Sequence, residues 1–256
     1  MVWRVWKKHT LKMALDIDDN RRGYASAGIL PVCRINGVPH ALLGREEYNR
    51  SKRWADFAGR KKASDTDVYA TAAREFCEES VHTVHLNGVA CNSVEAVAEH
   101  LRLGNYILRV TIEKVSKGKR VVFVVLADHD RGVVQRFAAV RSAQLHLERY
   151  TPKLHSGNYQ QWWLPGTIMQ RDTGRVLVLP DYFEKAALQY WPFSALMQAV
   201  ANHGSIPFTA RSPSAAFRLD IVPLFNAVLP ILTDGSLARP TVFTGAVAVC
   251  PWSPTP

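Results

Sequence analysis

The sequence is poor in cysteine and has no long apolar run, and each absence excludes a class of protein. Its four cysteines, Cys33, Cys77, Cys91 and Cys250, lie far apart, and no CxxC pair occurs. We therefore expect four reduced thiols in an intracellular, cytoplasmic protein, and no zinc site. No apolar stretch reaches the roughly 18 residues that a transmembrane helix needs, so no membrane span is expected.

Repeats, low-complexity tracts and a signal-peptide pattern are also absent. The N-terminal segment MVWRVWKKHTLKM is basic, but it has neither an uninterrupted apolar stretch nor a small-residue cleavage site. We expect three parts: an N-terminal arm over residues 1–22, a main domain over 23–204, and a C-terminal extension of unknown role over 205–256. Oligomeric state stays open, with a homodimer as one alternative.

Acidic residues are outnumbered by basic ones, 22 Asp and Glu against 32 Lys and Arg, which gives a formal net charge of +10. Such a surface attracts polyanions through long-range electrostatics and counterion release. Nucleic acids, nucleotides and inositol phosphates all satisfy this preference. A generally basic surface without a specific partner is the alternative.

Three glutamates stand close together on one predicted helix. In the segment REFCEES, residues three and four positions apart share a helix face, which groups Glu75, Glu78 and Glu79. Arg74 precedes Glu78 by four residues and can pair with it. Carboxylates this close repel one another unless a cation lies among them, and Mg²⁺ or Mn²⁺ prefers oxygen ligands of this kind. A solvated acidic face on an amphipathic helix is the alternative.

This segment resembles the Nudix box, the signature G-x5-E-x7-R-E-U-x-E-E-x-G-U of the Nudix hydrolases. Gly59 takes the first position, Arg74 and Glu75 the RE pair, and Glu78 and Glu79 the EE pair. The flanking segments SAGILPVCRINGVPHALLGRE and WADFAGR resemble the first hairpin of a Nudix domain and the approach to its box. They are most similar to a subset found in large DNA viruses and protists.

The match departs from the family pattern at three places. The first acidic position holds Asp65 rather than Glu, and one extra residue separates it from Arg74. Val81 replaces the final glycine, and Ala58 stands where many members have a second glycine. The metal-binding part, REFCEES, is intact.

The resemblance implies an α/β fold, an α/β/α sandwich around a mixed sheet. It also implies hydrolysis of a diphosphate linkage in a nucleoside diphosphate joined to another group, X, with Mg²⁺ or Mn²⁺ as cofactor. Glu75, Glu78 and Glu79 would hold the metal ions, and Arg74 would orient Glu78 or Glu79. Messenger RNA decapping is a sharper version of this function, and a non-catalytic nucleotide- or RNA-binding module is the alternative.

Further residues are expected around the substrate. Loop cations and a glycine would hold or admit phosphate groups, and a tryptophan would stack on a base; these are Arg45, Arg53, Gly59, Arg60, Lys61 and Trp162. An exposed loop is the alternative for the cations, and a core position for the tryptophan. The general base is not located: Gln160 and Gln161 lie near its expected place, and one of the three glutamates as base is the alternative. Glu148 is a candidate for an extra metal ligand or the base, although a surface glutamate is the simpler interpretation.

Local patterns predict the main elements. Asn36-Gly37 predicts a tight hairpin between strands 24–35 and 39–44. Further strands are expected over 106–115, 120–127 and 175–179, and helices over 93–103, 132–149, 180–203 and 214–229. The helix over 180–203, with a break near Pro192, is expected to pack on the sheet.

Overall fold

The structure is a computed structural model that describes most of the chain between residues 23 and 233. The described ranges are 23–47, 53–91, 93–114, 118–150, 164–169, 176–202, 205–206, 215–218 and 221–233. The predicted N-terminal arm therefore lies outside the described residues. No helix in these ranges is long and apolar enough to cross a membrane.

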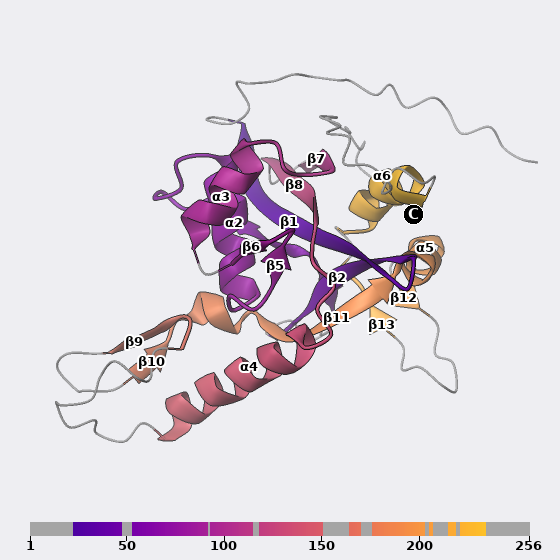
Figure 1. Cartoon of the computed structure of the whole chain (residues 1–256). Helices are drawn as coiled ribbons and strands as arrows, with labels where there is room; N and C mark the ends of the chain where they lie inside the picture. The colour runs from indigo at the N-terminus through magenta and orange to yellow at the C-terminus, as the bar shows by residue number, and fades with distance from the viewer. Residues whose placement is uncertain are drawn as a thin grey trace, which may run out of the picture.

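A mixed sheet of seven strands forms the centre of the molecule (Figure 1). Its strands are β1 (Tyr24–Ile35), β2 (Val38–Glu46), β3 (Trp54–Ala55), β4 (Phe57–Arg60), β7 (Leu108–Lys114), β8 (Gly118–Leu126) and β11 (Lys185–Pro192). The order is β11-β2-β1-β8-β7, with β3 paired to β2 and β4 paired to β1. β1 and β8 run parallel, while the other pairs are antiparallel.

The first two strands form the predicted hairpin. Asn36 and Gly37 both have positive φ, 50° and 80°, as a two-residue hairpin turn requires. The two strands then diverge: β1 pairs with β2 only from Val32 to Ile35, and its first half pairs with β4 instead. β4 thereby enters the sheet beside the start of β1, which brings the chain to the helix that follows.

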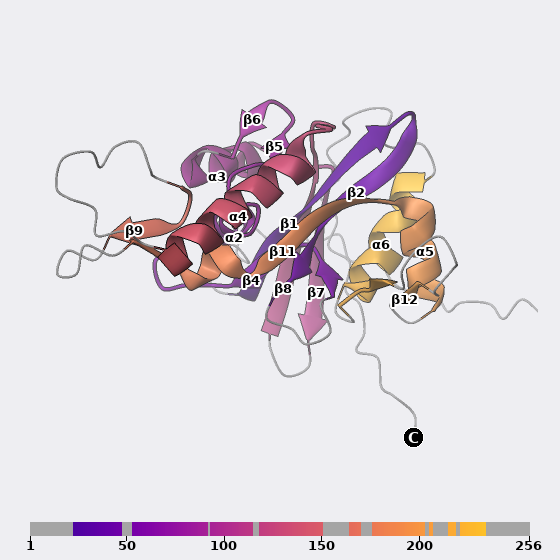
Figure 2. The same cartoon turned by 90° about the horizontal axis from the view of Figure 1, so that it is seen from below.

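Helices cover both faces of the sheet, as Figure 2 shows from below. They are α2 (Val68–Glu79), α3 (Val94–Arg102), α4 (Val133–Tyr150), α5 (Phe193–Ala201) and α6 (Val222–Thr233), with one 3-10 turn, η2 (Pro180–Phe183). α2, α3 and the start of α4 lie on one face and α5 and α6 on the other. The expected α/β/α sandwich around a mixed sheet is confirmed.

Two apolar cores separate these layers. One contains Phe57, Phe76 and Phe123 between the sheet and α2. The second contains Leu30, Val122 and neighbouring residues beneath α5 and α6, including the buried side chains of Phe217, Leu224, Phe225, Val228 and Leu229. The described part of the predicted C-terminal extension therefore covers the second face of the sheet.

Short elements complete the described chain. Three two-stranded sheets pair β5 (His85–Leu86) with β6 (Val89–Ala90), β9 (Thr167–Met169) with β10 (Val176–Val178), and β12 (Ser205–Ile206) with β13 (Ala215–Ala216). The predictions for 93–103, 132–149 and 175–179 agree with α3, α4 and β10. Ser93 caps α3 as expected, because its hydroxyl oxygen accepts a hydrogen bond from the Ala96 N–H at 3.2 Å.

The single helix predicted over 180–203 is wrong in its first half. After η2, residues Lys185–Pro192 form β11, which pairs with β2 along the edge of the main sheet, and only Phe193–Ala201 is helical. The apolar spacing of Phe183, Ala187 and Tyr190 fits a helix, but the free edge of β2 provides backbone partners that a local pattern does not reveal. Similarly, 214–229 contains β13 before α6 begins at Val222.

Candidate active site

Helix α2 carries the three predicted carboxylates and is capped at its start. At its start, the Asp67 carboxylate accepts a hydrogen bond from the Ala70 N–H at 2.7 Å, which caps the helix. Its apolar face packs into the core through Ala72, Ala73 and Phe76, all fully buried. The opposite face points Arg74, Glu75 and Glu78 toward β4 and the segment after it. We call Glu75, Glu78 and Glu79 the carboxylate cluster.

Arg74 connects the cluster to the preceding loop. Its Nε and Nη2 donate to the two oxygens of Asp65, each at 2.9 Å, so this pair is bidentate. Its Nη1 donates to Glu75 at 2.8 Å and to Glu78 at 2.9 Å. Burial alone would lower the pKa of Arg74, but the carboxylates around it, Asp65 first, raise that pKa above its ordinary value. The guanidinium is therefore a fixed cation.

Asp65 is held in place by hydrogen bonds. Burial alone would raise the pKa of Asp65, but hydrogen bonds from Arg74, from the Lys62 N–H and from the Thr71 hydroxyl lower it. Asp65 occupies the first acidic position of the Nudix box pattern. One more residue separates it from Arg74 than in that pattern. Its contacts make it the residue that orients Arg74.

Glu75 lies against strand β4, at the place where a glycine is required. A Cβ added at Gly59 would overlap the Glu75 carboxyl group. Gly59 therefore permits the Glu75 carboxyl group to lie against β4, and it stands within a strand opposite Ala27. Its predicted role beside phosphate groups stays a prediction. Burial raises the pKa of Glu75 to about 7, and the charge of Arg74 partly opposes this rise.

Glu78 contacts a lysine that joins the cluster to a distant part of the chain. Lys62 Nζ lies 3.3 Å from Glu78 Oε1 and 2.7 Å from Asp181 Oδ2, the latter in η2. The predicted Arg74–Glu78 pair is confirmed at 2.9 Å. Lys62 and Arg74 thus place two cations beside one carboxylate.

Glu79 is almost completely buried and pairs with a buried lysine from β11. Lys185 Nζ lies 3.2 Å from Glu79 Oε1, and the two side chains are 1% and 2% exposed. Gly44 makes room for this lysine, because a Cβ there would come within 2.7 Å of Lys185 Cδ. Burial raises the pKa of Glu79 well above its ordinary value, and Lys185 opposes this rise.

These residues fit the divalent cation that the family resemblance implies. The second oxygen of Glu79, Oε2, is buried and has no hydrogen-bond partner in the described part of the chain. An unsatisfied buried carboxylate oxygen is costly, and a bound cation would satisfy it. Glu75 and Glu78 add carboxylate oxygens on the same helix, and oxygen is the ligand that Mg²⁺ and Mn²⁺ prefer. In this structure, however, the three carboxylates do not all lie within 4.8 Å of one another, as the ligand atoms of Cys77, His82 and Cys91 do.

Four residues near the cluster come from the segment predicted as helix and were missed. Asp181 contacts Lys62, Tyr182 lies near Glu78, Lys185 pairs with Glu79, and Glu184 is close enough to raise the pKa of both Glu75 and Glu79. Their only sequence signal is the presence of three charged residues within five positions after Pro180, which form no recognisable motif. The strand pairing of β11 with β2 brings them to α2.

The predicted substrate-binding residues are spread over several places. Arg60 and Lys61 are exposed beside Gly59, and Lys61 Nζ lies 4.9 Å from the centre of the Tyr24 ring. Arg45 follows Leu43 on the face of the sheet that α5 and α6 cover, away from α2. Arg53 precedes β3, and its carbonyl oxygen accepts a hydrogen bond from the Glu46 N–H. Trp162, Gln160 and Gln161 lie outside the described residues, as does the side chain of Glu148.

The end of α2 shows how the chain accommodates Val81 at the position where the Nudix box pattern has glycine. The N–H groups of Val81 and His82 donate back to the carbonyls of Glu78 and Cys77, and both residues have positive φ, 45° and 60°. A left-handed conformation costs a non-glycine residue roughly 1–2 kcal/mol. Val81 is 1% exposed, and burying its side chain returns roughly 1.5–3 kcal/mol. Burial in the core therefore offsets the strain at Val81.

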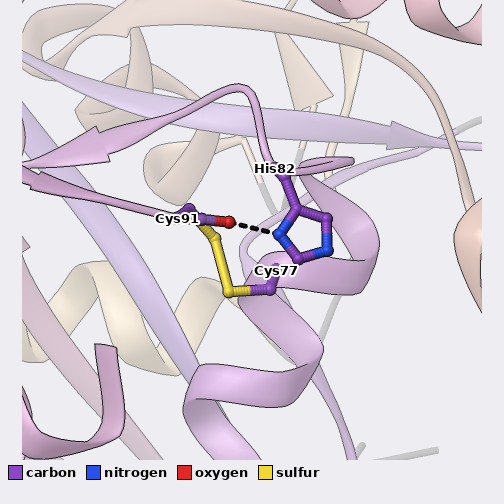
Figure 3. A group of neighbouring side chains, drawn as sticks. All are labelled: Cys77, His82 and Cys91. Atoms are coloured by element: carbon purple, nitrogen blue, oxygen red, sulfur yellow. Dashed lines mark hydrogen bonds between the residues drawn. A yellow bond between two sulfur atoms is a disulfide. The ribbon is translucent and has the colours of Figure 1, made fainter. Parts of the chain in front are cut away.

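The expectation of four reduced thiols is wrong for two of them. Cys77 on α2 and Cys91 after β6 form a disulfide, with Cα atoms 5.8 Å apart (Figure 3). Their separation of 14 residues carries no recognisable signal, and only the return of the β5–β6 hairpin toward the helix brings them together. Cys33 is free and buried, and burial raises the pKa of its thiol to about 11. Cys250 lies outside the described residues.

Comparison with protein-family models and with curated proteins finds no match. Among solved structures, the chain is similar to an Ap4A hydrolase of C. elegans in a binary complex, with 9% identity, coverage of 82% of this chain and 98% of that one, and a TM-score of 0.40. It is also similar to a NUDIX hydrolase from Nitrosomonas europaea, with 11% identity, 90% and 81% coverage and a TM-score of 0.40. A third is the NUDIX domain of Shewanella oneidensis NrtR complexed with ADP ribose, with 10% identity, 85% and 94% coverage and a TM-score of 0.37.

Proposed function

We propose that this chain is a Nudix-type pyrophosphohydrolase that uses Mg²⁺ or Mn²⁺ to hydrolyse a diphosphate linkage in a nucleoside diphosphate joined to a group X. The observation that carries the proposal is the carboxylate cluster itself. Three buried glutamates lie on the last turn and a half of α2, one of them with an unsatisfied buried oxygen. Burying three acids on one helix is unfavourable without cations near them, and a module that only binds ligand does not need them.

The residues of the chain divide into those that hold the cation and those that orient the holders. Glu75, Glu78 and Glu79 would provide the oxygen ligands. When bound, the metal ion would neutralise phosphate charge and lower the pKa of an attacking water. Arg74 keeps Glu75 and Glu78 in place through hydrogen bonds of 2.8 and 2.9 Å, and Asp65 in turn keeps Arg74 in place.

We propose Glu184 as the general base. It is an exposed carboxylate at the junction of η2 and β11, near Glu75 and Glu79, and its backbone carbonyl is held by the Glu47 N–H at 2.8 Å. A base must reach the water that attacks phosphorus while remaining outside the metal's own ligand set. Glu184→Gln should lower turnover but leave Mn²⁺ affinity unchanged, whereas loss of Mn²⁺ affinity would make Glu184 a metal ligand instead.

Capped RNA is the substrate that we place first. The net charge of +10 favours a polyanionic substrate, and the resemblance to the subset from large DNA viruses and protists points in the same direction. The test incubates purified protein and Mg²⁺ or Mn²⁺ with capped RNA, ADP-ribose, dinucleoside polyphosphates, nucleotide sugars and diphosphoinositol polyphosphates, with Glu78→Gln in parallel. Release of a methylated guanosine diphosphate by the wild type alone would support decapping. Turnover confined to a small nucleotide would identify that nucleotide, and not capped RNA, as the substrate.

A specific observation favours a second candidate, a Nudix-fold module that binds a nucleotide or RNA without cleaving it. Lys62 and Lys185 already contact Glu78 and Glu79 as counter-charges. If lysines replace the metal permanently, Glu78→Gln should leave ligand affinity nearly unchanged, and no metal-dependent turnover should occur on any member of the panel. Ligand binding retained together with turnover that collapses in the variant would exclude this candidate.

A further inference from the structure

A second group of possible metal ligands lies at the end of α2, apart from the carboxylate cluster. It contains Cys77 on the helix, His82 just after it, and Cys91 after β6, and we call it the cysteine–histidine cluster (Figure 3). One ligand atom from each residue lies within 4.8 Å of the other two. Thiolate sulfur and imidazole nitrogen are the ligands that Zn²⁺ prefers, whereas Mg²⁺ prefers oxygen.

Burial of the side chain does not offset the cost of the left-handed backbone conformation at His82. Its φ of 60° costs about 1–2 kcal/mol, as for Val81, but its side chain is only half-buried and returns less apolar burial than Val81. The left-handed turn instead directs the imidazole back toward Cys91. What the turn provides is therefore the placement of a ring nitrogen beside two sulfur atoms.

Contacts on both ring nitrogens fix the orientation of that imidazole. Nδ1 is hydrogen-bonded to the carbonyl oxygen of Cys91, and Nε2 lies 3.2 Å from the Tyr182 hydroxyl. The His82 and Tyr182 rings also stack, with centroids 5.9 Å apart and planes 20° from parallel. A metal-binding histidine uses one nitrogen for the metal and the other for a hydrogen bond that fixes the ring. Tyr182 can provide that outer contact when the nitrogen facing Cys91 binds a metal.

Charge balance suits a divalent ion at this buried place. Cys77 and Cys91 are both fully buried, where an isolated charge would be costly. Two thiolates and a neutral imidazole around a divalent ion sum to zero net charge. A fourth position would remain for water, as in zinc sites with three protein ligands.

We propose that, in the reduced protein, Cys77, His82 and Cys91 bind one thiophilic divalent ion of the Zn²⁺ class. The disulfide and the metal site are then two states of the same cluster. A dithiol reductant supplies two electrons and two protons, which cleave the S–S bond into two thiols, and the reductant becomes a disulfide. Metal binding afterwards forms two metal–sulfur bonds and releases the two thiol protons. This proposal does not depend on the hydrolase function, and it replaces the expectation that the chain has no zinc site.

The test uses Co²⁺ as a spectroscopic substitute for Zn²⁺. The full chain carrying Cys33→Ser and Cys250→Ser, which leaves only the two cluster cysteines, is reduced with a dithiol, desalted without oxygen and titrated with Co²⁺. We expect a sulfur-to-cobalt charge-transfer absorption that saturates at one ion per chain and disappears when Zn²⁺ is added. The same titration without reduction should give no such absorption, because both sulfurs are then in the disulfide.

Variants separate this site from the carboxylate cluster. Cys91→Ser should abolish the absorption, His82→Asn should weaken Co²⁺ affinity at least about tenfold, and Glu78→Gln should leave both unchanged. His82→Asn keeps both cysteines and therefore remains informative if the cysteine variant does not fold. No sulfur-to-cobalt absorption in the reduced protein would overturn the proposal. So would absorption that survives in Cys91→Ser, or Co²⁺ affinity unchanged in His82→Asn.

Discussion

At the scale of single residues, one arginine determines how the acidic residues of the site are arranged. Arg74 is hydrogen-bonded to Asp65, Glu75 and Glu78 at once, and its Nη2 also donates to the carbonyl of Arg60 at 2.9 Å. A lysine has the same charge but lacks the planar fork that makes these contacts simultaneous. The site therefore depends on the shape of the guanidinium as well as on its charge.

Arg74→Lys should lower metal affinity and turnover by about 10- to 100-fold, because Glu75 and Glu78 lose their common donor. Mn²⁺ titration by calorimetry, together with turnover, measures the effect. Arg102→Lys is the matched control, since Arg102 pairs with Asp67 and Glu99 on a more exposed surface of α3. Equal and small effects in both variants would show that the fork geometry is not used.

Glu75 makes the stability of the metal-free protein depend on pH. Its pKa of about 7 in the folded chain lies above the ordinary 4.5, so between these values the folded state binds more protons than the unfolded state. Stability is therefore greatest at the acidic end of this range and falls as pH rises toward 7, by about 3 kcal/mol at most. Glu79 acts in the same direction.

Thermal unfolding in a chelator from pH 5 to pH 8 measures this dependence. We expect the midpoint of the wild type to fall as pH rises, and the fall to be much smaller in Glu75→Gln. Excess Mg²⁺ should flatten the wild-type curve, because the metal replaces the proton as counter-charge. A midpoint that rises through this range in the chelated wild type would contradict the assignment of a raised Glu75 pKa.

At the scale of elements, strand β11 completes the site that α2 begins. It extends the sheet beside β2 and carries Lys185 inward over Gly44 to the buried Glu79. Removing one member of a buried ion pair leaves the other uncompensated, at a cost of about 3–5 kcal/mol. A metal ion on Glu79 would compensate the same charge.

Lys185→Met should therefore destabilise the metal-free protein strongly and the metal-bound protein much less. The measurement is the rise in melting temperature on adding Mn²⁺, which we expect to be larger in the variant than in the wild type. Arg131→Met, which removes an exposed cation beside α4, should leave this rise unchanged. A metal-induced rise that is equal or smaller in Lys185→Met would mean that the metal does not reach Glu79.

The same elements show which parts of the fold were predictable. The β1–β2 hairpin, α2 and α3 follow from local signals: the Asn36-Gly37 turn, the spacing of the glutamates, and Ser93 as a cap. Strand β11 was predicted as helix because its pairing partner lies about 140 residues earlier in the chain, and a short apolar run fits both structures. Lys185 and Glu184 were missed for that reason alone.

The candidate site was predictable where its residues lie within one helix and not where it depends on contacts between segments far apart in the sequence. The Arg74–Glu78 pair and the position of three glutamates on one helix could be predicted from spacing. The Cys77–Cys91 disulfide could not, because a separation of 14 residues with an intervening hairpin carries no pattern. Asp65 was noted as a departure from the family pattern, and only its bidentate contact with Arg74 explains its role.

At the scale of the whole molecule, the C-terminal part of the described chain is needed to cover the sheet. α6 inserts Phe225, 1% exposed, against Phe217 with ring centroids 6.1 Å apart. The carboxylate cluster lies on the opposite face of the sheet. Stability and activity should therefore respond separately to changes in α6.

Phe225→Ala should lower the free energy of unfolding by about 3–5 kcal/mol while leaving turnover at low temperature nearly unchanged. Denaturant unfolding measures the first effect and a standard assay the second. Asn226→Ala, at the exposed neighbouring position of the same helix, is the control and should change stability little. A loss below 1 kcal/mol in Phe225→Ala would mean that α6 does not belong to the core.

The most direct test of the central claim is the dependence of diphosphate hydrolysis on Mg²⁺ concentration, in the wild type, in Glu78→Gln and in Glu99→Gln. Glu99 is an exposed glutamate of α3 and provides the matched loss of charge. We expect turnover that saturates with Mg²⁺ in the wild type and in Glu99→Gln, and that falls at least about 100-fold in Glu78→Gln. Turnover that needs no metal, or that survives in Glu78→Gln, would contradict hydrolysis by metal ions held on α2.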